Sequence, residues 1–333
     1  MVEVSVKSAR FLRGRGYIGS VVKRVLLAAP RGYCAGVERA VETVERALAQ
    51  NGPPVYVRKQ IVHNSHVVDE LRQRGAVFVA SVEDVPEGGL VVFSAHGIAP
   101  AVRAGAAARS LRTIDATCPL VTKVHAEARR YAAEGYTVVL VGHAGHEEVE
   151  GTMGEAPDSI VLVESVADAE QLEVANPQRV AYVTQTTLSV DETREIIAVL
   201  HHRFPTLHGP EKEDICYATT NRQQAVKELL PHVQLLLVLG STNSSNSQRL
   251  VEVARSAGVP AHLIESERAL DERWLEGVET VGVTSGASAP ESLVEDLCEW
   301  FRGHGVAEIR ELAPAEENVV FKLPAELRPR TAA

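Results

Sequence analysis

The sequence lacks several features that identify common classes of protein. Only four cysteines occur among its 333 residues, none of them in a C-x-x-C pair, so a disulfide framework is not indicated. No apolar run approaches the ~18 residues of a membrane span, and we expect no membrane association. The net charge of −10 argues against nucleic-acid binding, which normally requires a basic face. There is also no G-x-G-x-x-G motif and no P-loop, so neither a nicotinamide cofactor nor ATP is indicated.

Three of the four cysteines open successive thirds of the chain, and polar loops follow each of them at similar distances. The cysteines are Cys34, Cys118 and Cys216. A first loop residue follows each cysteine 28 or 29 positions later, in order His63, His146 and Ser244. A second loop residue follows 62 to 72 positions after each cysteine, in order His96, Thr186 and Ser288. This repetition predicts three related units that converge on one centre. Three thiolates at one centre are the ligand set for a metal, most simply an iron–sulfur cluster in which one iron has no protein ligand.

The alternative for these cysteines is a role as three small buried hydrophobic side chains. Each of them precedes a predicted helix, however, and a helix N-terminus stabilises a thiolate, which favours the metal. Cys298 is different, because it lies in the middle of a predicted helix, and we expect it in the core. Thiols that are available for a metal imply a reducing compartment, so we expect the protein in the cytoplasm.

Short apolar runs alternate with amphipathic stretches along the chain. The predicted strands are 25–29, 55–57, 90–94, 137–141, 159–163, 180–184, 235–239, 261–264 and 281–284, and the predicted helices are 36–50, 120–134, 190–203, 221–230, 247–257 and 291–301. Val- and Leu-rich runs of this length between helices indicate parallel strands that are buried on both faces. The predicted fold class is therefore α/β.

The cysteine spacing also predicts how the chain is divided. The expected segments are a basic, disordered extension at 1–24, α/β units at 25–117, 118–215 and 216–303, and a C-terminal tail at 304–333. The strand that leads to Cys34 is assigned to the first unit. The tail is expected to pack on the body, with residues 318–323 extended.

Every one of the polar loops follows a predicted strand. Because ligands of open parallel sheets bind outside the carboxyl ends of the strands, the six loops are predicted to face one central cavity. The hydroxyl and amide candidates at this cavity precede helices and are Ser244, Ser245, Asn246 and Ser288. Such groups at helix N-termini form an anion cradle; the alternative is ordinary N-capping, for which one serine is enough. The loop cores contain no Lys or Arg, so anion binding would depend on these hydroxyl and amide groups together with His63, His96 and His146. The alternative for each histidine is a purely structural role.

Two further residues in these loops have a possible role in proton transfer. Glu148 follows His146, and this position favours a role as a proton donor. The alternative is a solvated carboxylate in a first helical turn. Thr186 is either a helix cap or a hydroxyl that relays protons to the centre. A zinc site at His143 and His146 is only weakly indicated, because the second histidine of H-E-x-x-H is missing.

Taken together, these motifs resemble a known family. They lie at 30–37, 62–64, 94–97, 115–119, 142–146, 184–187, 214–222, 243–247 and 286–290. The sequence from about 25 to 323 is similar to the 4-hydroxy-3-methylbut-2-enyl diphosphate reductases, the last enzymes of the methylerythritol phosphate route to isoprenoids. The basic residues 1–24 lie outside the resemblance.

The resemblance implies a pseudo-threefold trefoil of three α/β units around a 4Fe–4S cluster whose fourth iron is open to substrate. The implied cluster ligands are Cys34, Cys118 and Cys216, and the implied diphosphate-binding residues are His63, His96, His146, Ser244, Ser245, Asn246 and Ser288. Thr186 and Glu148 would serve the substrate hydroxyl and proton delivery. The implied reaction converts the allylic diphosphate, by reductive dehydroxylation, to isopentenyl diphosphate and dimethylallyl diphosphate. Electrons would come from flavodoxin or ferredoxin.

Two other functions are compatible with the cysteine pattern. One is a hydrolase of phosphorylated substrates with zinc on the cysteines, and the other is a non-catalytic carrier or sensor of an iron–sulfur cluster. Broad absorption near 400 nm that dithionite bleaches would exclude zinc, and diphosphate binding would argue against a carrier.

Overall fold

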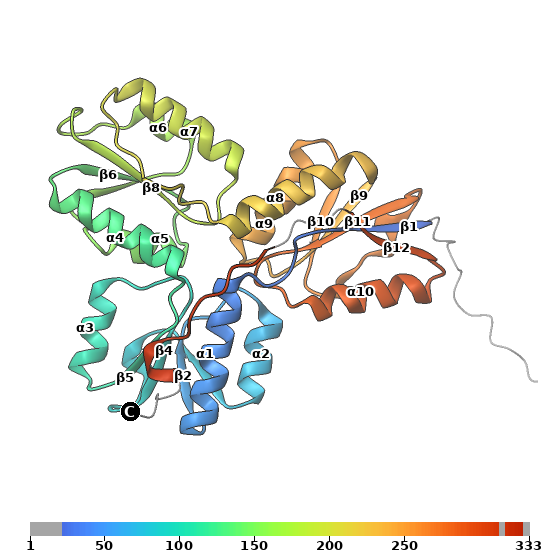
Figure 1. Cartoon of the computed structure of the whole chain (residues 1–333), viewed down its shortest axis with the longest axis horizontal. Coiled ribbons are helices and arrows are strands. Elements are labelled where there is room, and N and C mark those ends of the chain that lie inside the picture. Colours follow the sequence, from blue (N-terminus) through green and yellow to red (C-terminus); the bar gives the residue numbers. More distant parts are fainter. Residues whose placement is uncertain (1–21, 313–316, 329–333) are drawn as a thin grey trace, which may run out of the picture.

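The chain forms three lobes that meet at a common centre (Figure 1). The computed structural model describes residues 22–312 and 317–328. Of the extension expected at 1–24, residues 1–21 lie outside the described residues. Val22 is buried and Arg24 begins a strand, so these two positions belong to the folded body. Among the described residues, none of the helices combines the length and the apolar character needed to cross a membrane.

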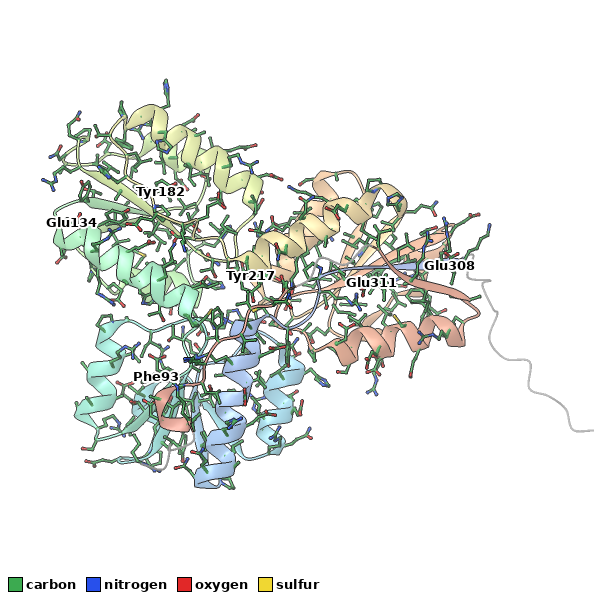
Figure 2. The ribbon with its side chains drawn as sticks, in the orientation of Figure 1. Phe93, Glu134, Tyr182, Tyr217, Glu308 and Glu311 are labelled. Atoms are coloured by element: carbon green, nitrogen blue, oxygen red, sulfur yellow. The ribbon has the colours of Figure 1, made fainter. Side chains whose placement is uncertain are left out.

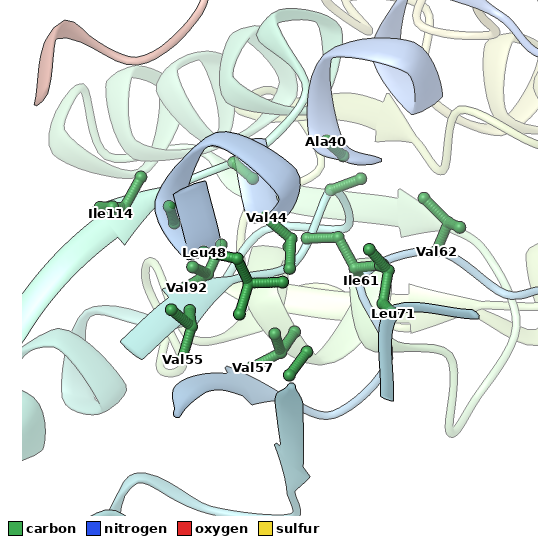
Figure 3. Close-up of a cluster of buried hydrophobic side chains, with 14 of the residues drawn as sticks. Ala40, Val44, Leu48, Val55, Val57, Ile61, Val62, Leu71, Val92 and Ile114 are labelled. Atoms are coloured by element: carbon green, nitrogen blue, oxygen red, sulfur yellow. The ribbon is translucent and has the colours of Figure 1, made fainter. Parts of the chain in front are cut away.

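The first lobe contains a four-stranded parallel sheet in the order β3-β2-β4-β5. Its strands are β2 (Val55–Arg58), β3 (Ala76–Val79), β4 (Leu90–Phe93) and β5 (Arg112–Asp115), and its helices are α1 (Ala35–Asn51), α2 (Ser65–Gln73) and α3 (Pro100–Ala108). Figure 3 shows how apolar residues of α1, such as Val44 and Leu48, pack against Val55 and Val57 of β2. Since α1 begins directly after Cys34, this packing fixes the direction from which that cysteine enters the centre.

The second lobe contains a three-stranded parallel sheet in the order β7-β6-β8. Its strands are β6 (Thr137–Val141), β7 (Ile160–Val163) and β8 (Val180–Thr184), and its helices are α4 (Pro119–Ala133), α5 (Glu147–Met153), α6 (Val166–Gln171) and α7 (Val190–Arg203). The third lobe contains a five-stranded parallel sheet in the order β10-β9-β11-β1-β12. Its elements are β1 (Arg24–Ala28), α8 (Tyr217–Leu229), β9 (Leu235–Leu239), α9 (Ser245–Ser256), β10 (Ala261–Ile264), β11 (Thr280–Ser285), α10 (Glu291–Gly303) and β12 (Glu308–Leu312).

The α/β class with parallel sheets is confirmed, and every predicted strand is present with its ends within one residue of the expected position. The central strands explain why the strand prediction was accurate. All five residues of β9 and all six of β11 are buried, and strands that are buried on both faces favour apolar residues. The prediction missed β3, β5 and β12, each of which lies at the edge of its sheet. β5 (Arg112-Thr113-Ile114-Asp115) and β12 carry polar residues, as edge strands do on their open side, so their apolar signal is weak. β3 is apolar throughout and was missed although its signal was present.

The assignment of the Cys34 strand to the first unit is wrong. β1 pairs in parallel with β11 on one side and with β12 on the other, so it lies inside the third sheet. Residues 308–312, expected in the tail, form the strand that covers its outer side. The chain therefore passes from the third lobe to the first between β1 and α1, directly through Cys34.

The C-terminal segment returns in the opposite direction, from the third lobe across the centre to the first (Figure 1). Leu327 is buried in the core of the first lobe, and the Arg39 side chain of α1 donates to the carbonyl of Lys322. This segment lies back on the body as expected, although residues 318–323 belong to neither a helix nor a strand.

A fully buried arginine holds these crossing segments together. Arg222 of α8 donates to the Gly32 carbonyl at 2.7 and 3.2 Å and to the Tyr33 carbonyl at 3.3 Å, immediately before Cys34. It also forms an ion pair with Glu317 of the C-terminal segment at 3.1 Å. A buried guanidinium needs such partners to offset its desolvation. Arg222 thereby joins α8, the Cys34 loop and the C-terminal segment.

We predict that Arg222→Ala lowers the free energy of unfolding by about 3–5 kcal/mol, because it leaves Glu317 and the buried carbonyls without their partner. The matched control is Arg46→Ala, whose exposed ion pair with Glu42 should contribute less than about 1 kcal/mol. Urea denaturation followed by circular dichroism measures both. Equal midpoints for the two variants would show that Arg222 does not join these segments.

Candidate functional site

Three of the four cysteines begin helices at the centre of the molecule. Cys34, Cys118 and Cys216 are the N-cap residues of α1, α4 and α8, one helix in each lobe. All three are free, and all three line one cavity that is partly open to solvent. Tyr217, directly after Cys216, lies where the lobes meet (Figure 2), and its hydroxyl accepts a hydrogen bond from the amide of Ala35 at 3.2 Å. Cys298 is buried in the third-lobe core, as expected.

The backbone beside these thiols has no room for a side chain. A Cβ on Gly36 would lie 2.8 Å from the Sγ of Cys118 and 3.7 Å from the Sγ of Cys34, and a contact below about 3 Å is one that carbon atoms do not make. The absence of a Cβ at this position therefore lets two thiols approach the same point. This is the first observation that favours a metal-binding centre.

The second is that all three thiols line one cavity, and their protonation state sets a condition for metal binding. Burial raises the pKa of Cys34, raises that of Cys118 to about 12 and raises that of Cys216 to about 11, and the neighbouring Cys34 adds to both increases. Backbone N–H groups at the helix starts lower these pKa values, as the sequence predicted, but burial outweighs them. Thiols with raised pKa values must lose their protons to bind a metal, so metal binding at this donor set would release protons.

All twelve residues that the sequence singled out as site residues line this one cavity. Besides the cysteines, they are His63, His96, His146, Glu148, Thr186, Ser244, Ser245, Asn246 and Ser288. The first lobe supplies two of the histidines, the second lobe supplies the third together with Glu148 and Thr186, and the third lobe supplies the serines and the asparagine. The prediction that loops at strand ends converge on one cavity is correct.

The three histidines form a cluster. The rings of His63 and His96 are stacked, with centroids 3.9 Å apart and planes 20° apart. The His146 ring meets both edge-on, with centroids at 5.2 Å from His63 and 5.9 Å from His96. Imidazoles from two lobes thus gather in one place.

His146 differs from the other two in its hydrogen bonding. It is the N-cap of α5, and its Nδ1 accepts from the amide of Glu148 at 3.2 Å. Burial, together with His96 and His63, lowers the pKa of His146 to about 3. The ring is therefore neutral, and because Nδ1 is the acceptor, Nε2 carries its N–H. His146 offers an anion a neutral donor rather than a positive charge.

The hydroxyl and amide groups of the third lobe connect the lobes as well as line the cavity. Ser244 caps α9 by accepting from the amide of Ser247 at 3.3 Å, which is the ordinary capping role. Ser288 donates to the carbonyl of His63 at 2.9 Å, and Asn246 accepts from the amide of Ala287 at 2.8 Å. Ser245 donates to the carbonyl of Thr187 at 3.2 Å. Only one of these side chains caps a helix, so the group exceeds what capping requires.

Glu148 and Thr186 form a buried pair. The Thr186 hydroxyl donates to Oε1 of Glu148 at 2.5 Å, and the Thr186 amide donates to Oε2 at 3.2 Å. Burial raises the pKa of Glu148 to about 7, although the two hydrogen bonds from Thr186 oppose the increase. A solvated carboxylate, the alternative from the sequence, does not fit this burial. The pair is suited to hold and release a proton near neutral pH.

The sequence prediction missed two polar residues beside the site. Thr219 lines the cavity, and its hydroxyl lies 3.2 Å from the Sγ of Cys216, with its amide at 3.4 Å. Its position three residues after a helix-capping cysteine was the available signal. Glu147 approaches the histidine cluster, with its carboxylate 3.6 Å from His63 Nε2 and 3.7 Å from His96 Nδ1. Its place between two other site residues gave no signal of its own.

Comparison with known proteins agrees with this geometry. The model of the family described as LytB protein matches residues 25–302. The chain is 58% identical over 307 residues to a 4-hydroxy-3-methylbut-2-enyl diphosphate reductase of Nocardia farcinica, covering 92% of this chain and 91% of the relative. It is 59% identical to 4-hydroxy-3-methylbut-2-enyl diphosphate reductase 2 of Mycobacterium tuberculosis H37Rv, covering 92% of each. A solved structure of the E-1-hydroxy-2-methyl-but-2-enyl-4-diphosphate reductase from Plasmodium falciparum is similar with a TM-score of 0.89 at 40% identity, over 92% of this chain and 97% of that one.

We predict that Gly36→Ala abolishes metal binding without unfolding the protein, because the added Cβ would occupy the space of the Cys118 thiol. Alanine favours a helix more than glycine does, so α1 should persist. The matched control is Gly303→Ala at the end of α10, where a Cβ meets open space. Iron analysis and circular dichroism of anaerobically purified protein measure both effects. Full iron content in Gly36→Ala would contradict the close approach of the thiols.

Proposed function

The chain belongs to the LytB protein family, and from that membership we propose that it reduces (E)-4-hydroxy-3-methylbut-2-enyl diphosphate to isopentenyl diphosphate and dimethylallyl diphosphate. This is the last step of the methylerythritol phosphate pathway, and the resemblance seen in the sequence is confirmed. The chain is thus an enzyme, an oxidoreductase of isoprenoid biosynthesis. The observation that supports the proposal most strongly is the single cavity that joins three free thiols, a histidine and serine cluster and a buried acid.

The thiols would hold the cofactor. Cys34, Cys118 and Cys216 supply three ligands, one fewer than the four irons of a 4Fe–4S cluster, so one iron would have no protein ligand. When bound, such a cluster supplies electrons one at a time and a Lewis-acidic site for the substrate oxygen. Thr219 would donate its hydroxyl and amide to the Cys216 sulfur, and hydrogen bonds of this kind tune a thiolate ligand.

The far side of the cavity would hold the diphosphate. Neutral His146 offers Nε2–H, and the hydroxyl and amide groups of Ser244, Ser245, Asn246 and Ser288 offer further hydrogen bonds at or near the start of α9. An anion held by several fixed donors loses little freedom in the later steps, and such positioning is worth several kcal/mol, on the order of 7 in favourable cases. The clamp would therefore fix the allylic end of the substrate beside the thiols.

Glu148 and Thr186 would deliver the proton that departs with the oxygen. In the balanced reaction the allylic C–O bond breaks, its bonding pair leaves with the oxygen, which takes up a proton and departs as water, and the allyl fragment receives two electrons from the external donor. A second proton adds at either end of that fragment, which gives the two products. Protonated Glu148 can pass its proton to Thr186, whose hydroxyl lies 2.5 Å from Oε1 and can pass one on to the substrate oxygen.

The source of the electrons and the location belong to the same proposal. The sequence shows neither a nicotinamide-binding motif nor a P-loop, so a protein donor such as flavodoxin or ferredoxin would deliver the two electrons. Free thiols at a metal centre require a reducing compartment, so the expected location is the cytoplasm.

The cysteine assignment predicts a clear pattern of iron loss. Cys34→Ser, Cys118→Ser and Cys216→Ser should each lose most of the bound iron and all reductase activity, because each removes one ligand. Cys298→Ser, in the third-lobe core, is the control and should keep both. Iron analysis and the absorption spectrum near 400 nm measure the result. Full iron in any of the first three variants would disprove a shared centre.

For Glu148→Gln we predict that turnover falls by roughly 10² or more, the usual contribution of a general acid, while inorganic diphosphate binds as in the wild type. The substitution keeps the size of the side chain but removes the dissociable proton. The glutamine oxygen can still accept from the Thr186 amide, and its NH₂ group can donate to the Thr186 hydroxyl. Glu150→Gln, on the same helix with its side chain half exposed, is the matched control and should retain normal turnover. A near-normal rate for Glu148→Gln would contradict proton delivery while leaving the cysteine assignment intact.

A further inference from the structure

Glu147 lies between His146 and Glu148 in the sequence, and the proposed function gives a role to both of them but none to Glu147. It is the first residue of α5 in the second lobe, yet its carboxylate approaches side chains of the first lobe. The oxygens lie 3.6 Å from His63 Nε2 and 3.7 Å from His96 Nδ1, and the Ser94 hydroxyl donates to Oε2 at 3.4 Å. The Glu147 side chain is only 13% exposed. A carboxylate at this depth beside an anion site needs a reason, because it would repel a diphosphate.

A divalent cation on His63, His96 and Glu147 is one explanation, since their ligand atoms all lie within 4.8 Å of one another. The ring geometry opposes it. The ring nitrogens bind a metal in the plane of the ring, and the planes of His63 and His96 are stacked 3.9 Å apart at 20°, so both rings cannot direct a nitrogen at one ion. Two N–H groups in such separated planes suit the two oxygens of one carboxylate instead.

We propose that Glu147 is a positioning residue that holds His63 and His96 as a stacked pair of imidazolium donors for the substrate diphosphate. The proposal rests on the function proposed above, since it concerns how the same cavity binds its anion. The proposal fixes where the charges lie: the Glu147 carboxylate is on one side of the two rings, and the diphosphate would be on the other. In the described part of the chain, the cavity lining includes His63 and His96 but not Glu147.

Proton counting explains why the carboxylate is needed. A neutral imidazole has one N–H, so a ring that donates to Glu147 would present an acceptor nitrogen to the diphosphate. Only the imidazolium form donates to both at once. Two stacked imidazolium rings repel each other and are costly to bury, and a carboxylate that faces both offsets that cost. His96 Nδ1 has no hydrogen-bond partner among the described residues, which leaves it free to take this contact when the ring is protonated.

The surrounding charges indicate that the rings take up protons only when the anion binds. Burial and the adjacent His63 lower the pKa of His96, and the opposing effect of Glu147 does not cancel this decrease. Burial alone would raise the pKa of Glu147, but His63 and His96 outweigh it and hold this pKa well below the usual range, so the group is an anion. The remaining charged or titratable neighbours are His146, which is neutral, His143, and Lys59, which pairs with Glu150 at 2.6 Å. Glu147 is therefore the negative charge that faces the ring pair.

The test is calorimetric titration of the anaerobically purified holoenzyme with inorganic diphosphate between pH 6 and pH 9, in two buffers of different ionisation enthalpy. We expect the wild type to take up protons on binding in the upper part of this range, because the rings must be protonated to donate on both sides. In Glu147→Gln, the affinity at pH 8 should fall by about tenfold or more and should recover as the pH is lowered, since acid protonates the rings without help from the carboxylate. A purely structural loss would not depend on pH.

Two variants serve as controls. Glu150→Gln removes a negative charge from the same helix and should change the affinity less than about threefold at every pH. Glu147→Asp keeps the charge on a shorter side chain and should restore part of the affinity at pH 8. If Glu147→Gln does not fold, proton uptake by the wild type together with the Glu147→Asp titration decides the question.

Each other outcome overturns a specific statement. If the wild type binds diphosphate without proton uptake, or if Glu147→Gln keeps the wild-type pH dependence, the role of Glu147 is wrong while the diphosphate site stands. If a chelator removes diphosphate binding but leaves the iron in place, the three residues hold a cation and the positioning role is wrong. If the wild type does not bind diphosphate at all, the proposed function itself fails.

Discussion

The whole structure depends on the approach of three short side chains to one point. A cysteine carries its sulfur only one carbon from the backbone, so three of them can share a centre only if three backbones come within a few ångströms of it. The chain achieves this by starting α1, α4 and α8 at the same place, each directly after a cysteine. Gly36 leaves the necessary space, and Arg222 fixes the loop that leads to Cys34. The sheets and the hydrophobic cores of the lobes hold these helix starts in place.

The start of α5 illustrates how neighbouring residues acquire different electrostatic properties. His146 accepts a backbone hydrogen bond and is neutral, Glu147 faces two histidines and is an anion, and Glu148 is buried against Thr186 with its pKa raised to about 7. Successive residues of a helix point about 100° apart, so each one meets a different environment. One turn of helix therefore places a neutral imidazole, a carboxylate anion and an acid that titrates near neutral pH at or beside a single cavity.

Much of this arrangement was predictable from the sequence. Buried parallel strands are rich in apolar residues, so most of them were visible in the sequence. Ligand-binding loops follow such strands, so residues such as His63 and Ser288 could be predicted to be neighbours in space. The pairing of β1 was not predictable, because the apolar run that forms a strand carries no signal for which sheet the strand enters. Glu147 was missed for a similar reason, since its partners lie in another lobe and its own sequence neighbours are both site residues.

The exchange of segments between the first and third lobes has a consequence for how the protein is made. β1 lies between β11 and β12, and Arg31 forms a 2.6 Å hydrogen bond with Glu311, 280 residues further along the chain. The loop before Cys34 therefore gains its final neighbours only when nearly all of the chain has left the ribosome. Contacts of such long sequence separation form late and slowly in folding. The cysteines proposed as metal ligands therefore gain their final surroundings only in the nearly complete, folded chain.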